Sequence, residues 1–159
     1  MPKASTPYSY LLDDYPGAYT AFSSRKLMSA YSSDCIIVRR TDSTQQNIGF
    51  VGDVLDTTSL SSFVGTGGTD NGFIATFYDQ VASFNLLQAT ALNQTKVVNA
   101  GVIETINTKP TIIFSSNTGL GTSGNLTLND TSELWFFYVI DLTDVTTGGV
   151  IFETSPNFN

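Results

Sequence analysis

The sequence predicts a mainly β protein, an antiparallel β-sandwich of the jelly-roll type with one or two short helices and an extended N-terminal arm. Two observations carry this prediction. Short runs rich in β-branched and aromatic residues recur along the chain, and Gly and Asn turn signals separate them, which is typical of antiparallel sandwiches. The 159 residues are also enough for one domain with a single hydrophobic core.

Residues 1–20 are expected to form the arm, because three prolines and a group of tyrosines and leucines follow no helical or alternating period. Such a segment gains stability by lying on its own domain or on a partner. Proline-punctuated, tyrosine-rich arms serve well as docking strands. The candidate partner-binding residues are therefore Tyr8, Tyr10, Leu11, Leu12 and Tyr15. Residues 21–159 then form the β-rich module.

The module is expected to begin with a short helix and a hairpin. Apolar side chains lie on approximately one helical face at Phe22, Leu27, Met28 and Tyr31. With Ser23 or Ser24 as N-cap, this spacing predicts a helix over residues 24–31. Residues 35–41 and 45–51 are rich in β-forming types and flank Asp42-Ser43-Thr44, which predicts a hairpin.

A second helix is expected over residues 57–64. Asp56 offers a cap, Leu60, Phe63 and Val64 supply the apolar positions, and Gly65 ends the run. The glycine-rich stretch 65–72 reads as a loop. It is not a phosphate cradle, since neither a lysine nor a convincing helix follows it.

After this loop the pattern is almost wholly β. Strands are expected at residues 73–78, 95–98, 111–115, 125–128, 134–142 and 149–154, with Gly and Asn turns between several of them. The consecutive aromatic residues 135–138 place rings on both faces of their strand. A central strand with one face in the core, and the other covered by a helix, a loop or a neighbouring subunit, would explain this pattern.

Charge and hydropathy exclude several partners. The formal net charge is −7, and the seven basic residues form no cluster longer than a pair, so we expect no nucleic-acid binding and no attraction to an anionic membrane surface. The longest apolar stretch, residues 134–140, is too short to span a bilayer. The N-terminus lacks the apolar core of a signal peptide, so use without export is expected.

Few residues could support catalysis. Histidine is absent, which removes the commonest general base and the usual zinc ligand. The only glutamates, Glu104, Glu133 and Glu153, form no recognisable acid pair for glycoside hydrolysis. We expect no enzymatic activity, no cofactor and no metal; calcium at Asp70 and Asn71 is the alternative, although EF-hand spacing is missing.

Cys35 is the only cysteine and lies in an apolar run, where a buried small hydrophobe is expected. No intrachain disulfide can form.

Several short blocks occur in a definite order between residues 21 and 114. They are Ser24-Arg25-Lys26-Leu27, Ile37-Val38-Arg39-Arg40, Asn47-Ile48-Gly49-Phe50, Leu55-Asp56-Thr57, Phe63-Val64-Gly65, Tyr78-Asp79-Gln80 with Asn85 and Gln88, and Lys109-Pro110. This stretch resembles the N-terminal half of the catalytic domain of the α-L-arabinofuranosidase B family. It also resembles virion proteins of crAss-like and other Bacteroidetes phages.

The resemblance implies a concanavalin-like sandwich after this module and a role as a virion structural protein. It points to a head-fibre or tail-fibre subunit, made in the bacterial cytoplasm and attached to capsid or tail proteins through its N-terminal region. Viral fibres are commonly homotrimers, so a homo-oligomer with three copies is expected. An alternative is that the chain forms the first part of a longer fibre protein.

Two departures from the family pattern matter. The family follows Tyr-Asp-Gln with Ser-Gly-x-Gly-Asn, whereas Phe84 and three other residues precede Asn85 here; Phe84 is a contact residue or a local hydrophobic plug. Glu153 lacks the surroundings of the family nucleophile. Asp79 is expected to cap the turn after its strand, with sugar contact as the minor reading.

The alternative function is a non-catalytic carbohydrate-binding module that recognises host surface glycan. Such modules use an aromatic platform. The aromatic side chains that could form this platform are those of Tyr19, Tyr31, Tyr78, Trp135 and Tyr138.

Overall fold

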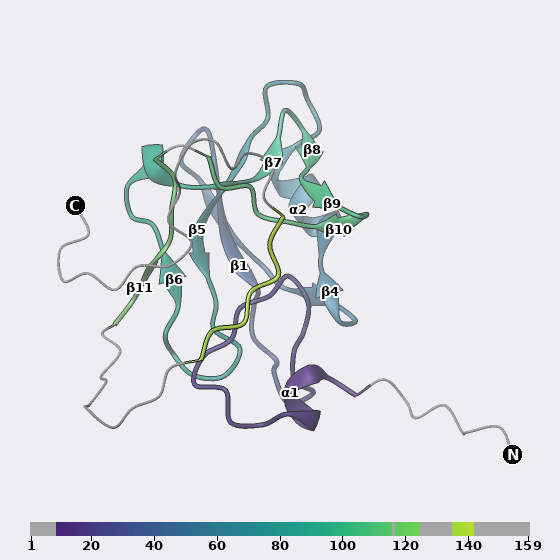
Figure 1. The fold of residues 1–159 in the computed structure, drawn as a ribbon. Coiled ribbons are helices and arrows are strands. Elements are labelled where there is room, and N and C mark those ends of the chain that lie inside the picture. The colour runs from purple at the N-terminus through teal and green to yellow at the C-terminus, as the bar shows by residue number, and fades with distance from the viewer. Residues whose placement is uncertain (1–8, 116, 125–134, 142–159) are drawn as a thin grey trace, which may run out of the picture. The chain divides into compact units, whose positions relative to one another are not determined.

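The computed structural model describes residues 9–115, 117–124 and 135–141. By its internal contacts the chain divides into two compact units, Met1–Asn125 and Leu126–Asn159. The described part of the first unit consists mainly of antiparallel strands with few helices (Figure 1), which confirms the mainly β prediction. Among the described residues, no helix has the length and apolar character that crossing a membrane requires.

The main sheet has the strand order β11-β6-β5-β1-β2, and β7 pairs with both β5 and β8. Its described strands are β1 (Ile36–Arg40), β2 (Gln45–Ile48), β5 (Gly72–Phe77), β6 (Leu86–Leu87), β7 (Lys96–Asn99), β8 (Val102–Ile103) and β11 (Gly121–Thr122). Two small hairpins are β3 (Phe50–Val51) with β4 (Val54–Leu55) and β9 (Thr105–Ile106) with β10 (Lys109–Pro110). The helical elements are α1 (Leu11–Asp14), α2 (Thr57–Val64) and the 3₁₀ turn η1 (Ala91–Asn93).

The predicted hairpin is confirmed by β1 and β2, which pair antiparallel from Ile36 opposite Ile48 to Arg39 opposite Gln45. Its turn is set by local chemistry, because the Thr44 amide donates to Asp42 Oδ1 at 3.0 Å and Ser43 adopts φ 69°. A side chain that captures a backbone amide two residues on is a common turn device.

The predicted second helix is confirmed as α2. The Asp56 carboxylate accepts from the Ser59 amide at 2.9 Å, as an N-cap should, and Gly65 ends the helix at φ 99°. Leu60 and Val64, one turn apart, are both buried. They bring α2 onto the sheet.

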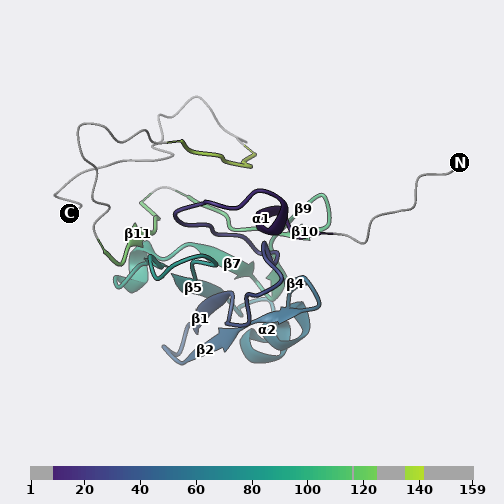
Figure 2. The same ribbon diagram turned by 90° about the horizontal axis from the view of Figure 1, so that it is seen from below.

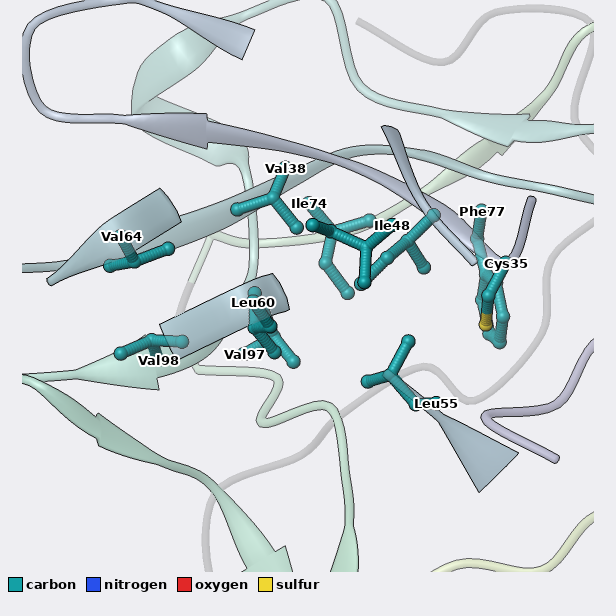
Figure 3. Close-up of a cluster of buried hydrophobic side chains, with 11 residues drawn as sticks. Cys35, Val38, Ile48, Leu55, Leu60, Val64, Ile74, Phe77, Val97 and Val98 are labelled. Carbon is teal, nitrogen blue, oxygen red and sulfur yellow. The ribbon is translucent and has the colours of Figure 1, made fainter. Parts of the chain in front are cut away.

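The core lies between one face of the main sheet and the segments packed on it (Figure 3). Its buried side chains are Cys35, Ile36, Val38, Ile48, Leu55, Leu60, Val64, Ile74, Phe77, Val97 and Val98. Partly buried side chains from outside the sheet complete it, among them Phe22 and Leu120. Helix α2 and the N-terminal segment thus pack on the same core (Figure 2).

The predicted helix over residues 24–31 is wrong, because this segment runs along β4 instead. The Lys26 amide donates to the Asp53 carbonyl at 2.8 Å, and the Leu55 amide donates to the Ser24 carbonyl at 2.9 Å. Arg25 also forms an isolated antiparallel bridge with Val54. These long-range bonds satisfy backbone groups that a helix would have paired internally.

The arm is not wholly extended, since Leu11–Asp14 form one helical turn. In the predicted strand 111–115 only an isolated bridge between Ile113 and Lys96 forms, and residues 135–141 contain no strand. Apolar composition is not sufficient for a strand, which needs a neighbour in register. Residues 1–8 and the predicted strands 125–128 and 149–154 lie outside the described residues.

Candidate partner-binding site

The described part of the arm is fixed to the module by backbone and side-chain bonds. The Leu12 amide donates to the Leu27 carbonyl at 2.8 Å. The Asp13 carboxylate accepts from the Ser29 amide at 3.1 and 3.2 Å. These bonds hold α1 beside residues 27–29, so its side chains have defined positions.

Two buried residues after β5 tie the N-terminal segment to the sheet. Gln80 accepts from the Leu27 amide at 2.7 Å and donates to the carbonyls of Ser23 and Arg25 at 3.0 and 2.8 Å. Its own amide donates to the Ala21 carbonyl at 2.8 Å. A single glutamine side chain thus satisfies three backbone groups of a segment that has no regular secondary structure.

Asp79 is a scaffold residue, as its turn context predicted. Its buried carboxylate accepts from the amide of Ala21 at 2.8 Å and from that of Val81 at 3.0 Å. It also accepts from the amides of Ala82 and Phe84 at 3.2 and 3.3 Å. With these acceptors occupied, Asp79 orders the turn and has little capacity left for a ligand.

The structure separates the candidate arm residues into two groups. Tyr10 and Leu12 are half-buried, and the Lys26 ammonium lies 5.6 Å from the centre of the Tyr10 ring. Leu11 and Tyr15 are 56% and 72% exposed, and the Tyr15 amide donates to the Leu11 carbonyl at 3.0 Å. The exposed pair therefore lies one helical turn apart on the same side of α1. Tyr8 lies outside the described residues.

Of the aromatic residues considered for glycan contact in the first unit, Tyr19 is exposed and the other two are half-buried. The Tyr19 side chain is 56% exposed, and its ring centre lies 5.1 Å from that of Phe84. The Phe84 ring therefore packs against the Tyr19 ring. Tyr31 is half-buried, donates to the Asp34 carbonyl at 2.7 Å, and has a pKa raised to about 12, mainly by burial. Tyr78 is also half-buried, and Trp135 and Tyr138 belong to the second unit.

Two aspartates of the described chain are paired with arginines. Arg40 donates to Asp42 and holds the pKa of that carboxyl well below its usual range. The Arg25 guanidinium, 2.9 Å away, lowers the pKa of Asp53. Among the described residues, no group of His, Cys, Asp or Glu is arranged to hold a metal. Glu133 and Glu153 lie outside them.

Two further candidates from the sequence are explained by packing. The oxygen atoms of Asp70 and Asn71 accept from the amides of Gly67 and Ala100 at 2.8 and 3.2 Å, so these side chains serve as turn caps. Cys35 is buried, and burial raises the pKa of its thiol to about 12. An open depression of about 410 Å³ is lined by Arg40 and Phe63 among others, and the Arg40 guanidinium donates to the Phe63 carbonyl at 3.1 Å.

One residue of interest was missed by the sequence reasoning. Arg39 is only 9% exposed and makes no ion pair with a described acid. The Arg39-Arg40 pair could have signalled this, because alternation along a strand must send one of two consecutive arginines to each face.

No protein-family model, curated protein or solved structure matches this chain. The resemblance noted from the sequence therefore stays a prediction.

Proposed function

We propose that this chain is a non-catalytic structural subunit of a bacteriophage particle, a head-fibre or tail-fibre subunit attached through its N-terminal region. The observation that carries the proposal is the fixed presentation of Leu11 and Tyr15 on an arm segment bonded to Leu27 and Ser29. The particle context comes from the sequence resemblance of residues 21–114. A virion location, after synthesis in the host cytoplasm, follows from the same resemblance.

The chemistry of the described acids supports a structural role. Asp42, Asp53 and Asp56 have lowered pKa values because arginine or serine side chains donate to them. A general acid for glycoside hydrolysis needs a raised pKa and a second carboxylate facing it. The described carboxylates show the opposite direction of shift where a shift is resolved.

A concanavalin-like sandwich remains the predicted complete fold. The antiparallel main sheet is compatible with it, because a sandwich requires such a sheet with a second sheet packed on one of its faces.

Composition of the purified particle tests the proposal. The polypeptide is expected in the mass spectrum of virions of the parent phage, and Leu11→Glu with Tyr15→Glu is expected to abolish its incorporation. The matched control is Val51→Glu with Val102→Glu, at two other exposed apolar positions, which should leave incorporation unchanged. Virions that lack the wild-type polypeptide would refute the proposal.

Glycan recognition is the second candidate, favoured by the exposed Tyr19 ring beside Phe84. Sugars pack on exposed aromatic faces. Glycan-array binding should then be lost in Tyr19→Ala and retained in Tyr15→Ala, which changes a more exposed tyrosine outside this pair. Absence of binding by the wild-type chain would remove this candidate.

A further inference from the structure

The face of the main sheet opposite the core, called here the outer face, carries two rows of side chains. Opposite partners in a sheet share a face. One row therefore runs through Ile37, Thr76 and Leu87 on β1, β5 and β6. The second row runs through Arg39, Phe73 and Lys96 on β1, β5 and β7. Ile36 and Val38, which alternate with Ile37 and Arg39 on β1, point into the core.

The outer face combines apolar surface with positive charge. Arg39 donates to Gln94 Oε1 at 2.6 Å and to the carbonyls of Arg40 and Ala91 at 2.8 and 3.3 Å, and its guanidinium lies 4.6 Å from the Phe73 ring centre. These acceptors are all neutral. A buried cation without a carboxylate partner is unfavourable unless an opposite charge is supplied.

The outer face also offers an exposed apolar side chain and a second cation to a binding partner. Leu87 is 38% exposed, and the Lys96 ammonium is bonded to the neutral Asn99 Oδ1 at 2.9 Å. Asn47 of β2 lies opposite Ile37 and donates to the Asp34 carboxylate at 2.6 Å, so one described acid borders this face at the β2 edge. The centre of the outer face is therefore apolar and basic within a chain of formal net charge −7.

The exposed side of α1 has complementary properties. Leu11 and Tyr15 are apolar and exposed, and the exposed Asp14 adds a carboxylate to the same turn, whereas Asp13 is bonded to the Ser29 amide of its own module. One helical turn separates Leu11 from Tyr15 by about 6 Å along the axis. The two rows of the outer face are separated by two residues of β1, about 7 Å. One arm side chain can therefore lie on each row.

We propose that the arm of one copy binds the outer face of a second copy. Leu11 and Tyr15 pack on the apolar side chains of the two rows, and the Asp14 carboxylate faces Arg39 and Lys96. The contact joins two different surfaces of the same chain, so it is heterologous, and repetition gives either a closed ring or an open filament. A ring of three copies is one closed form. The inference rests on the proposed function and deepens it, because it names a neighbouring copy of the subunit as the partner of the arm, so that the chain enters the particle as an assembly of copies.

The test uses the full-length chain and two variants with complementary defects. The arm variant, Leu11→Glu with Tyr15→Glu, keeps an intact outer face. The face variant, Leu87→Glu with Lys96→Glu, keeps an intact arm. By analytical ultracentrifugation, wild type should self-associate with concentration and each variant should be monomeric. An equimolar mixture of the two variants should give a one-to-one heterodimer, because only one intact arm and one intact face remain.

The matched control, Val51→Glu with Val102→Glu, should associate like wild type, and circular dichroism should show that every variant is folded. A monomeric wild type, as expected if another part of this chain covers the outer face, would overturn the inference. So would a mixture that stays monomeric, or variants that associate like wild type. The polypeptide could still be present in virions after any of these outcomes, so failure here is distinct from failure of the proposed function.

Discussion

At the scale of single residues, Gln80 shows how a segment without regular structure is held in place. Its buried side chain accepts from Leu27 and donates to the carbonyls of Ser23 and Arg25. Backbone groups at such sites must be paired, because a buried unpaired group costs as much free energy as a lost hydrogen bond. In this module a side chain supplies the pairing that a strand or helix would otherwise give.

Replacing Gln80 tests this role. Gln80→Leu keeps the volume but leaves the Leu27 amide and two carbonyls without partners, so we expect the free energy of unfolding to fall by about 2 kcal/mol. The control is Gln46→Leu, at an exposed position on β2, which should change it by less than about 0.5 kcal/mol. Urea unfolding measures both. Equal effects at the two positions would contradict the role given to Gln80.

Cys35 provides a second residue-scale prediction. Burial raises the pKa of its thiol to about 12, so at about pH 8 roughly one molecule in ten thousand carries the reactive thiolate. Alkylation by iodoacetamide should therefore be very slow in the native state and fast in denaturant. No other cysteine is present, so the signal is unambiguous. Rapid native labelling would mean that this part of the core opens readily.

At the scale of elements, the cap of α2 links stability to pH. Hydrogen bonds from Ser59 lower the pKa of Asp56. A carboxyl whose pKa is lower in the folded state stabilises that state above its unfolded pKa of about 4, and the contribution is lost as pH falls through the folded value. The cap should therefore weaken in acid.

Asp56→Asn isolates this effect, because asparagine also caps helices but does not titrate. The difference in unfolding free energy between wild type and this variant should favour wild type at about pH 7 and shrink at about pH 2.5. Asp56→Ala, which removes the cap, should lose about 1 kcal/mol at neutral pH. A difference between wild type and the asparagine variant that does not vary with pH would argue against a charged cap.

The elements predicted correctly are those with local determinants. The β1–β2 hairpin has its turn set by Asp42 and Thr44, and α2 has both caps, Asp56 and Gly65, within its own sequence. Residues 24–31 have a helical spacing of apolar side chains, yet their conformation is set by Asp53 and Gln80. Contacts at that sequence separation leave no periodic signal, so the prediction could not have identified them.

The sequence identified the segment that holds the candidate site but not which of its side chains are exposed. Composition pointed to the arm, but exposure distinguishes Leu11 and Tyr15 from Leu12, whose amide is paired with Leu27. The outer face was not anticipated, because its rows join residues far apart in sequence, such as Ile37 and Leu87. Strand order, which the single sequence does not reveal, creates that surface.

At the scale of the first unit, the core connects the sheet, α2 and the N-terminal segment. Phe22 packs against the buried cluster, and Ser24, Lys26 and Leu27 are bonded to β4, to Asp53 and to Gln80. Elements that share one core and one bonding network open together in a cooperative unit. The segment from residue 21 to residue 29 is therefore expected to belong to the same unit as β1 and β5, and to support α1 rigidly.

Native-state hydrogen exchange tests whether residues 21–29 stay bound to the core or detach from it by local opening. The amides of Lys26, Leu27 and Leu55 donate to the Asp53 carbonyl, the Gln80 side chain and the Ser24 carbonyl, so they should exchange only through the global opening that also releases Ile74 of β5. Their opening free energies should equal that of Ile74 and fall with it on addition of urea. In Gln80→Leu the Leu27 amide should lose this protection while Ile74 keeps the exchange behaviour of the remaining global opening. Exchange of Lys26 and Leu27 at unprotected rates in the wild-type chain would show that the segment detaches. The arm would then meet its partner as a mobile strand, at a higher entropic cost, and the fixed spacing of Leu11 and Tyr15 would have no role in binding.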